Sequence, residues 1–242
     1  IILPPETEEQ DLRRIMSELE QACDELQIEI LGGHTEVSDA VNRPVITVTG
    51  VGKVARGDLL STGGMQPGDE LVMTKWAGLE GSAIIAAEKR DVLEQTLPAH
   101  LIDTAESFLK HISVVPEAKI AMQHGVHAMH DVTEGGIFGA LWEMGAASGV
   151  GIVADLDKIP IRQETIELCE VFDINPYLLI SSGCMLIGCE NGNLLVERLQ
   201  EAGIPAAVIG RATEGNDRVI RSGEETRFLE PAGSDELYKI YE

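Results

Sequence analysis

The chain has 242 residues and a net charge of −23, and 44% of its residues are hydrophobic while only 4% are aromatic. A chain of this length can bury a sizeable aliphatic core, as one large domain or two small ones. The acidic surplus excludes non-specific binding to nucleic acid, because too few Lys and Arg are present to displace counterions from phosphates. No apolar run reaches membrane length and no signal-peptide pattern occurs, so we expect no membrane span and a cytoplasmic location.

The first predicted domain covers residues 1–58 and combines one helix with extended segments. Thr7 is expected to precede the helix, with Gln10 completing a capping box. One apolar stripe then recurs at spacings of three and four, formed by Leu12, Ile15, Met16, Leu19, Cys23 and Leu26. We expect a buried strand at residues 28–31 and a second extended segment at 44–54, which is rich in Val and Ile. These elements make half of a helix-on-sheet domain.

The second predicted domain covers residues 59–242, after a stretch from Gly57 to Asp69 that is rich in Gly, Ser, Thr and Pro. Strands are expected at 70–74, in a segment ending at His130, at 151–154, 184–189 and 206–209, and as a pair near Arg218 and Arg227. Helices are expected around 80–95, 99–111 and 117–124, after Gly136, and at 163–171 and 192–202. This order predicts an α+β or α/β sandwich with helices packed on a mixed sheet.

The first candidate site is the loop Gly32-Gly33-His34-Thr35-Glu36, which follows the predicted helix. Adjacent glycines let a ligand approach the main chain, while Thr35 can donate a hydrogen bond and Glu36 can hold or orient a cation. This chemistry suits a phosphate or a metal-bound nucleotide. A Gly-Gly turn is equally common as a sharp corner between elements, so the loop alone leaves both interpretations open.

The second candidate site is the segment HDVTEGG at residues 130–136, followed by an apolar-periodic stretch. Asp131 and Thr133 stand where a strand would pass into a helix, whose N-terminal N–H groups and dipole attract anions. We expect Asp131 to bind Mg²⁺ while Thr133 and the N–H groups of Gly135 and Gly136 hold phosphate oxygens. The alternative is that Asp131 caps the helix and Glu134 is a first-turn acid.

Other motifs are less informative. Neither loop matches a Walker A sequence or GxGxxG, which disfavours a P-loop NTPase and a dinucleotide-binding domain. His124, His127 and His130 recur every third residue, but an extended segment would place His127 and His130 on opposite sides, so a histidine metal site is disfavoured. His130 is a better candidate for a loop residue near a ligand. The four cysteines form no CxxC pair and are expected to be reduced and mostly buried.

The order of these segments resembles the AIR synthase-like (PurM-like) superfamily, which includes the hydrogenase maturation factor HypE, selenophosphate synthetase and thiamine-monophosphate kinase. The resemblance covers nearly the whole chain and is strongest to HypE-like proteins. It is carried by GGHTEV at 32–37, the Val/Ile-rich segment at 42–52, QPGDELVMTK at 66–75, HDVTEGG at 130–136 and the stretch 159–176.

This resemblance implies a two-domain protein that binds ATP with Mg²⁺ between its domains and forms a homodimer through the first one. By position, Gly32, Gly33, His34, Thr35 and Glu36 match the family's loop near the phosphates, and Asp131 matches a metal-binding aspartate of some relatives. Thr133, Gly135 and Gly136 match the loop behind that aspartate. The resemblance further implies an acceptor, either a small molecule or a group carried by a protein, that is activated by phosphoryl transfer.

Two departures from the family pattern stand out. The family's glycine-rich and Asp-bearing segments before the first helix, which supply most metal ligands, do not occur here, so we expect a fragment or a chain that has lost them. HypE proteins end with a cysteine that carries the thiocarboxamide to be dehydrated, whereas this sequence ends LYKIYE. The leading hypothesis is an ATP-dependent phosphoryl-transfer enzyme. The alternative is a catalytically inactive nucleotide-binding or scaffold protein of the same fold.

Overall fold

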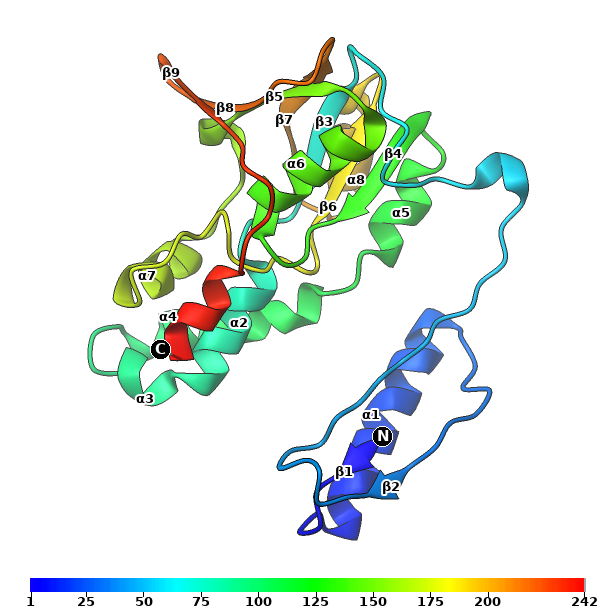
Figure 1. Ribbon diagram of the computed structural model, residues 1–242, viewed down its shortest axis with the longest axis vertical. Helices are drawn as coiled ribbons and strands as arrows, with labels where there is room; N and C mark the ends of the chain where they lie inside the picture. The colour runs from blue at the N-terminus through cyan, green and yellow to red at the C-terminus, as the bar shows by residue number, and fades with distance from the viewer. Residues whose placement is uncertain (242) are drawn as a thin grey trace. The chain divides into compact units, whose positions relative to one another are not determined.

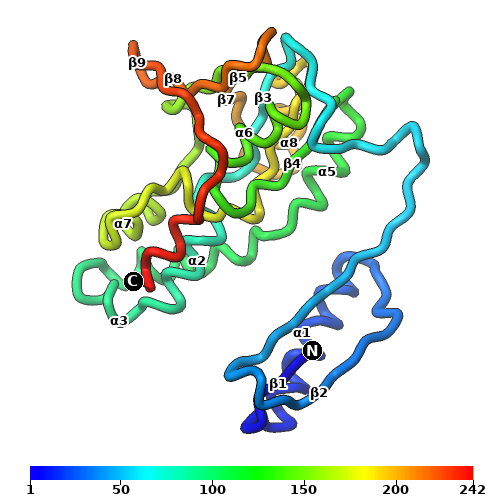
Figure 2. The backbone as a smooth tube through the Cα atoms, viewed as in Figure 1, coloured from blue at the N-terminus to red at the C-terminus, as the bar shows by residue number. Residues whose placement is uncertain are grey.

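The computed structural model describes residues 1–241, and the chain divides into two compact units (Figures 1 and 2). The first unit is Ile1–Asp58 and the second begins at Leu59. Each unit is described by itself below. In the described part of the chain, no helix is both long and apolar enough to cross a membrane.

The first unit consists of one long helix and a short two-stranded sheet. Helix α1 spans Glu9–Leu26, and strand β1 (Ile2–Leu3) pairs in parallel with β2 (Glu36–Val37). Residue Ile2 also forms an antiparallel bridge with Val45. A three-residue 3₁₀ turn, η1 (Arg56–Asp58), closes the unit.

Helix α1 begins one residue later than the sequence predicted. Its N-cap is Glu8, whose backbone N–H donates to the Asp11 carboxylate at 3.4 Å. Asp11, and not Gln10 as predicted, therefore completes the capping box. The Thr7 hydroxyl instead donates to the carbonyl of Pro4 at 2.8 Å. Because the helix starts after Glu8, Thr7 stabilises the turn that precedes the helix instead of its first turn.

The strand predicted at residues 28–31 is wrong, and the extended segment predicted at 44–54 does not become a strand. Residues 28–31 form no strand, and the segment 44–54 is extended without a ladder apart from the Val45 bridge. Leu31, Val48 and Val51 are 89%, 75% and 89% exposed. Val and Ile favour extended backbone, but a strand also needs a neighbour to receive its hydrogen bonds. In the described part of the chain residues 28–31 pair with no strand, and in 44–54 only Val45 exchanges backbone hydrogen bonds with a neighbour, Ile2.

The second unit is built around a seven-stranded mixed sheet with the order β4-β6-β3-β7-β5-β8-β9. All neighbouring strands are antiparallel except β5 and β8. The strands are β3 (Glu70–Thr74), β4 (Val126–Asp131), β5 (Gly151–Asp155), β6 (Met185–Cys189), β7 (Ala206–Thr213), β8 (Arg218–Ser222) and β9 (Glu225–Phe228). Helices on a mixed sheet were predicted, and this prediction is confirmed.

The helices of this unit follow the predicted order, with two subdivisions. The region 80–95 is split at Lys89 into two helices, and the region 99–111 ends in 3₁₀ geometry. The helices are α2 (Leu79–Glu88), α3 (Arg90–Leu93), α4 (Ala99–Glu106), α5 (Val115–Ala121), α6 (Gly136–Ser148), α7 (Gln163–Val171) and α8 (Gly192–Glu201), with 3₁₀ turns η2 (Ser107–His111), η3 (Leu156–Lys158) and η4 (Glu236–Tyr241).

The core lies on both faces of the sheet, as the central strand β3 illustrates. Leu71 and Met73 face a large cluster that includes α6, whereas Val72 faces a smaller cluster formed with α5 and α8. This alternation follows from the two-residue period of a strand. The helices α2, α4 and α7 contact one another and gather at one end of the sheet (Figure 1).

Candidate functional site

The first candidate loop lies in the first unit, between α1 and β2. All of Gly32, Gly33, His34, Thr35 and Glu36 are exposed. A Cβ atom added to either glycine would meet no atom within 4 Å, so a ligand could approach this backbone closely. The His34 Nε2 and a carboxylate oxygen of Glu36 are 3.5 Å apart.

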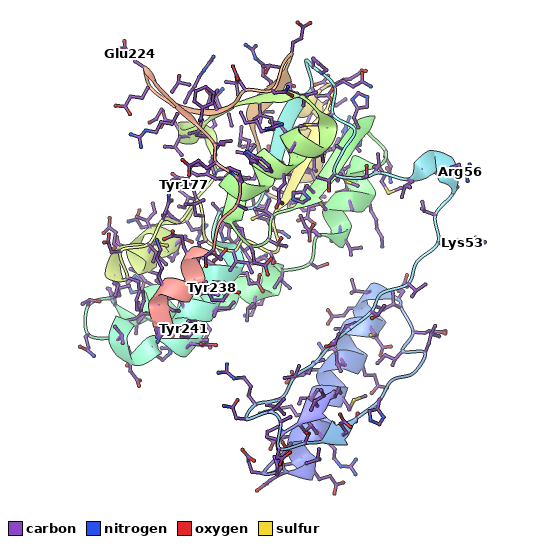
Figure 3. All side chains as sticks on the ribbon, in the orientation of Figure 1. Lys53, Arg56, Tyr177, Glu224, Tyr238 and Tyr241 are labelled. Atoms are coloured by element: carbon purple, nitrogen blue, oxygen red, sulfur yellow. The ribbon has the colours of Figure 1, made fainter. Side chains whose placement is uncertain are left out.

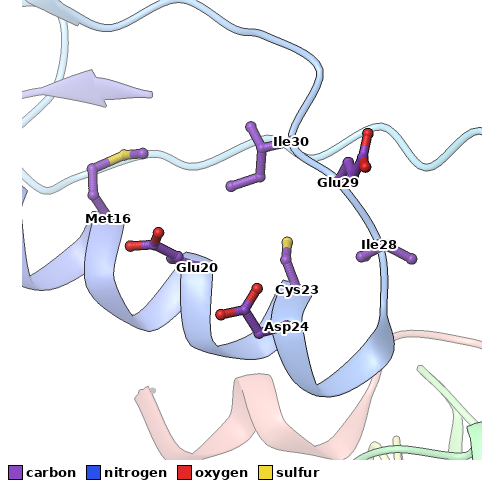
Figure 4. Close-up of a pocket in the computed structure, with 7 residues that line it drawn as sticks. All are labelled: Met16, Glu20, Cys23, Asp24, Ile28, Glu29 and Ile30. Atoms are coloured by element: carbon purple, nitrogen blue, oxygen red, sulfur yellow. The ribbon is translucent and has the colours of Figure 1, made fainter.

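A shallow pocket elsewhere in the first unit has the wrong chemistry for a phosphate. It lies between α1 and the segment 28–30 (Figure 4). Three of its lining residues are acidic, namely Glu20, Asp24 and Glu29, and none is basic. Three carboxylates repel an anion, so this pocket is not assigned to the nucleotide.

The second candidate loop begins where edge strand β4 ends. Asp131 is the last residue of β4 and pairs with Met185 of β6. The next residue, Val132, is buried, and its N–H donates to the Cys184 carbonyl at 3.1 Å. The sheet therefore fixes the backbone on both sides of Asp131, while the residue itself is exposed.

The turn from Thr133 to Gly136 requires glycine for steric reasons. Gly135 is the N-cap of α6 with φ +81°, and Gly136 follows with φ +59°, both in the left-handed region. A Cβ atom on Gly136 would lie 2.5 Å from the Tyr177 carbonyl oxygen. Because Gly135 is the N-cap, Asp131 does not cap α6 and Glu134 lies outside its first turn.

The amides of both glycines are hydrogen-bonded within the chain. Gly136 N–H donates to the Thr133 carbonyl at 3.1 Å, and Gly135 N–H donates to the Asp235 carboxylate at 2.7 Å. We expected these amides to hold phosphate oxygens, but in this structure neither is free. The glycines contribute the shape of the turn, and the groups of this loop left for a ligand are the Asp131 carboxylate and the half-buried Thr133 hydroxyl.

The histidines of β4 are engaged by other side chains. His130 was expected in a loop near a ligand, but it lies within β4, and its ring nitrogens contact Thr62 Oγ1 at 3.1 Å and a Glu143 carboxylate oxygen at 2.9 Å. His127 Nδ1 lies 2.9 Å from the buried Asp69 carboxylate. Both ring nitrogens of His130 are therefore engaged, whereas Nε2 of His127 lies 4.0 Å from the exposed Glu190 carboxylate.

The cysteines are free thiols, and three of them are buried. Burial raises the pKa of the Cys184 and Cys169 thiols to about 12 and that of Cys189 to about 11. A thiol with so high a pKa stays protonated near neutral pH and is a poor nucleophile. None of these three residues is therefore a candidate for covalent catalysis.

Comparison with known proteins identifies the family. Residues 66–222 match AIR synthase related protein, C-terminal domain, and residues 1–54 match AIR synthase related protein, N-terminal domain. The chain belongs to the AIR synthase-related family. The fold is PurM-like, as predicted from the motifs.

HypE proteins are prominent among the relatives of this family member. A protein of Methanocaldococcus jannaschii named for hydrogenase expression and formation is 29% identical over 224 residues, 91% of this chain and 64% of that protein. Carbamoyl dehydratase HypE of Rhodobacter capsulatus is 27% identical over 226 residues, again 91% of this chain and 64% of the relative. The chain thus spans 64% of the length of these two curated relatives.

Solved HypE structures share the fold. A crystal structure of HypE from E. coli has a TM-score of 0.81 at 20% identity, covering 99% of this chain and 74% of that one. A HypE structure in complex with ATP has a TM-score of 0.73 at 18% identity, covering 98% and 72% of the two chains.

Within this family member, Asp131 has the chemistry of a single carboxylate ligand for Mg²⁺. It is exposed, and no described residue forms a hydrogen bond or ion pair with its carboxylate. Among the described residues, no group of three or more His, Cys, Asp or Glu could hold a metal ion by itself. Mg²⁺ commonly takes one or two carboxylates and completes its shell with phosphate oxygens and water, so Asp131 fits a metal that arrives with a nucleotide.

Two groups near this loop escaped the sequence analysis. Asp235 bonds to Gly135 from 100 residues further along the chain, and Tyr177 stacks on Phe138 of α6 with ring centroids 5.3 Å apart. Asp235 stands in an acidic stretch that looks like ordinary surface, so no local signal marks it. Tyr177 directly follows the 159–176 stretch that carries the family resemblance, which was the only available signal.

Proposed function

We propose that the chain is an ATP-dependent enzyme of the HypE-like branch of its family. In this proposal Mg-ATP activates an acceptor oxygen on a small molecule or on a group carried by a protein. The oxygen attacks the γ-phosphorus, the bond between that phosphorus and the β–γ bridging oxygen breaks, and ADP leaves. Membership of the family together with an ATP complex of a HypE relative supports this proposal.

The residues proposed for the nucleotide come from both units. Gly32, Gly33, His34, Thr35 and Glu36 would bind the nucleotide together with Thr133, and Asp131 would hold Mg²⁺. Gly135 and Gly136, whose amides are bonded within the chain, would shape the turn that presents Asp131 and Thr133. The observation that carries the assignment is the Asp131 carboxylate, which is exposed at the end of edge strand β4 and has no partner among the described residues. Mg²⁺ would neutralise charge on the phosphates, and the chain's residues would orient them.

The proposed assembly is a homodimer formed through the first unit. The exposed Val and Ile side chains of segment 44–54 support it, because a monomer seldom leaves such a patch open to water. Size-exclusion chromatography with light scattering should give twice the monomer mass, and a monomer at micromolar concentration would contradict the assembly. The proposed compartment is the cytoplasm, where the free thiols would stay reduced.

Isothermal titration with Mg-ATP tests the nucleotide assignment. We expect the wild type to bind, and Asp131→Asn to weaken binding by about 10- to 100-fold, as is typical when a metal site loses a ligand or its support. The matched control is Asp91→Asn, which removes the same charge from an exposed aspartate in α3 and should leave binding unchanged. A wild type that shows no heat and no ATP turnover would refute the proposal.

A further inference from the structure

The C-terminal segment, residues 229–241, lies over the turn that carries the second candidate loop. In Figure 2 this segment is red, and it passes beside the start of α6 before ending in η4. Ala232 lies close to the turn. A Cβ atom added to Gly135 would be 2.9 Å from the Cβ of Ala232, and one added to Gly139 would be 3.2 Å from that same atom. The start of α6 is therefore in direct contact with the end of the chain.

Asp235 is the polar anchor of this contact. It is 4% exposed, and its carboxylate accepts backbone N–H groups from three different segments. Gly135 donates to Oδ2 at 2.7 Å, while Ile180 and Leu237 donate to Oδ1 at 3.2 and 2.8 Å. No Lys or Arg of the described chain pairs with it, so amides and the positive end of the 13-residue helix α6 balance its charge.

The segment 175–180 bonds both to the C-terminal segment and to α6. Asn175 N–H donates to the buried Glu236 carboxylate at 3.0 Å, and Phe138 N–H donates to the Tyr177 carbonyl at 3.2 Å. Figure 3 marks Tyr177 in this segment and Tyr238 in η4. The turn, this segment and the chain end thus hold one another, and Asp235 is the residue that bonds to all three.

We propose that Asp235 is a positioning residue for the nucleotide site, which it serves by fixing the turn that presents Asp131 and Thr133. The inference rests on the proposed function. Two successive glycines in left-handed conformations can adopt many other shapes, so the turn needs an outside anchor. A carboxylate that fixes the Gly135 amide supplies one, as supporting residues do around metal and phosphate sites.

A competing role for Asp235 predicts the opposite effect. If its carboxylate were an internal stand-in for phosphate, the nucleotide would have to displace it, and removing it would tighten binding. The structure favours a fixed support, because Asp235 and Glu236 are both buried and each bonds to the backbone of another segment. The Tyr241 hydroxyl also bonds to Glu88 of α2, which holds the far end of η4 in place.

The variant Asp235→Asn separates these roles in the full chain. Asn offers one acceptor oxygen in place of two, so either Gly135 or the Ile180 and Leu237 pair must face an NH₂ group. We expect Mg-ATP to bind about tenfold more weakly by titration calorimetry, the equivalent of one charge-assisted hydrogen bond. Without nucleotide, amide protons of 133–139 should exchange about tenfold faster. The control Glu230→Gln changes an exposed acid of the same segment and should alter neither measurement.

Every result of these measurements either supports or overturns the proposed role of Asp235. Equal or tighter nucleotide binding by Asp235→Asn, or a lower melting temperature with an unchanged Kd, overturns the positioning role. If the wild type binds no Mg-ATP, the proposed function fails, and the exchange measurement alone decides whether Asp235 fixes the turn. If the variant does not fold, the exchange rate of the Gly135 amide proton in the wild type is measured by NMR. Slow exchange supports the hydrogen bond from this amide to Asp235, and exchange at the rate of an open loop refutes it.

Discussion

A buried ion pair between Lys75 and Glu117 gives the sharpest test of the second unit's packing. Lys75 follows β3 with φ +55°, a conformation that is strained for a residue with a side chain. Its Nζ lies 2.6 Å from Glu117 Oε1 and donates to the carbonyls of His111, Ser113 and Gly183 at 2.7, 2.8 and 2.9 Å. Glu117 is 0% exposed, and neither of its carboxylate oxygens accepts a hydrogen bond from a described residue.

Replacing Lys75 and replacing Glu117 should lower the free energy of unfolding by different amounts. Lys75→Met leaves a buried carboxylate without its counter-charge and three carbonyls without donors, so we expect a loss near the top of the range of about 3–5 kcal/mol for a broken buried pair. Glu117→Gln leaves the ammonium bonded to its three carbonyls, so its loss should fall near the bottom of that range. The loss of unfolding free energy in the double variant should be at least about 2 kcal/mol smaller than the sum of the two single losses, because the second change removes a charge that the first has already left unpaired.

Urea unfolding followed by tryptophan fluorescence measures these costs. Both tryptophans, Trp76 and Trp142, belong to the second unit, so the signal reports on the unit that contains the pair. Losses below about 1 kcal/mol for each single variant, or strict additivity in the double variant, would show that this pair is not buried and coupled as the structure has it.

Two further predictions follow from the backbone and the thiols. Gly136→Ala should lower the free energy of unfolding by at least about 2 kcal/mol, because the new Cβ would meet the Tyr177 carbonyl oxygen at 2.5 Å. Gly149→Ala, at φ +67° with open space around it, should lower it by only about 1 kcal/mol. Equal losses in the two variants would contradict the close approach at Gly136. Burial raises the pKa of Cys184 to about 12, so its stabilising contribution is present below the unfolded pKa of about 8.5 and is lost as pH rises. From pH 8.5 to 10 the wild type should therefore lose about 1.5 kcal/mol more stability than Cys184→Ala, measured by urea unfolding at each pH, and parallel losses would contradict the burial.

The elements of the second unit could be predicted from sequence because their local signals and their tertiary environment agree. The turn 66–69 introduces the apolar strand 70–74, and helix 163–171 was predicted with the bounds the structure has. In the first unit the signals were equally clear but misleading. Residues 28–31 and 44–54 have strand composition, yet a strand forms only where a neighbour accepts its hydrogen bonds, and composition carries no information about that neighbour.

The candidate site could be predicted only in part, for a similar reason. The change from strand to helix around Asp131 is a local pattern, and the structure has that residue exposed at the end of β4. The sequence did not reveal that the Gly135 amide is taken by Asp235, because the two residues are 100 positions apart and an acidic stretch looks the same whether it is buried or solvated. That the two glycine-bearing loops share one ligand remains a prediction.

Hydrogen–deuterium exchange with and without Mg-ATP tests that central claim most directly. If both loops bind one magnesium-bound nucleotide, amides in residues 32–37 and in residues 131–136 should become protected together, with the same dependence on nucleotide concentration. Protection of only one of the two segments, or of neither at saturating Mg-ATP, would contradict the account.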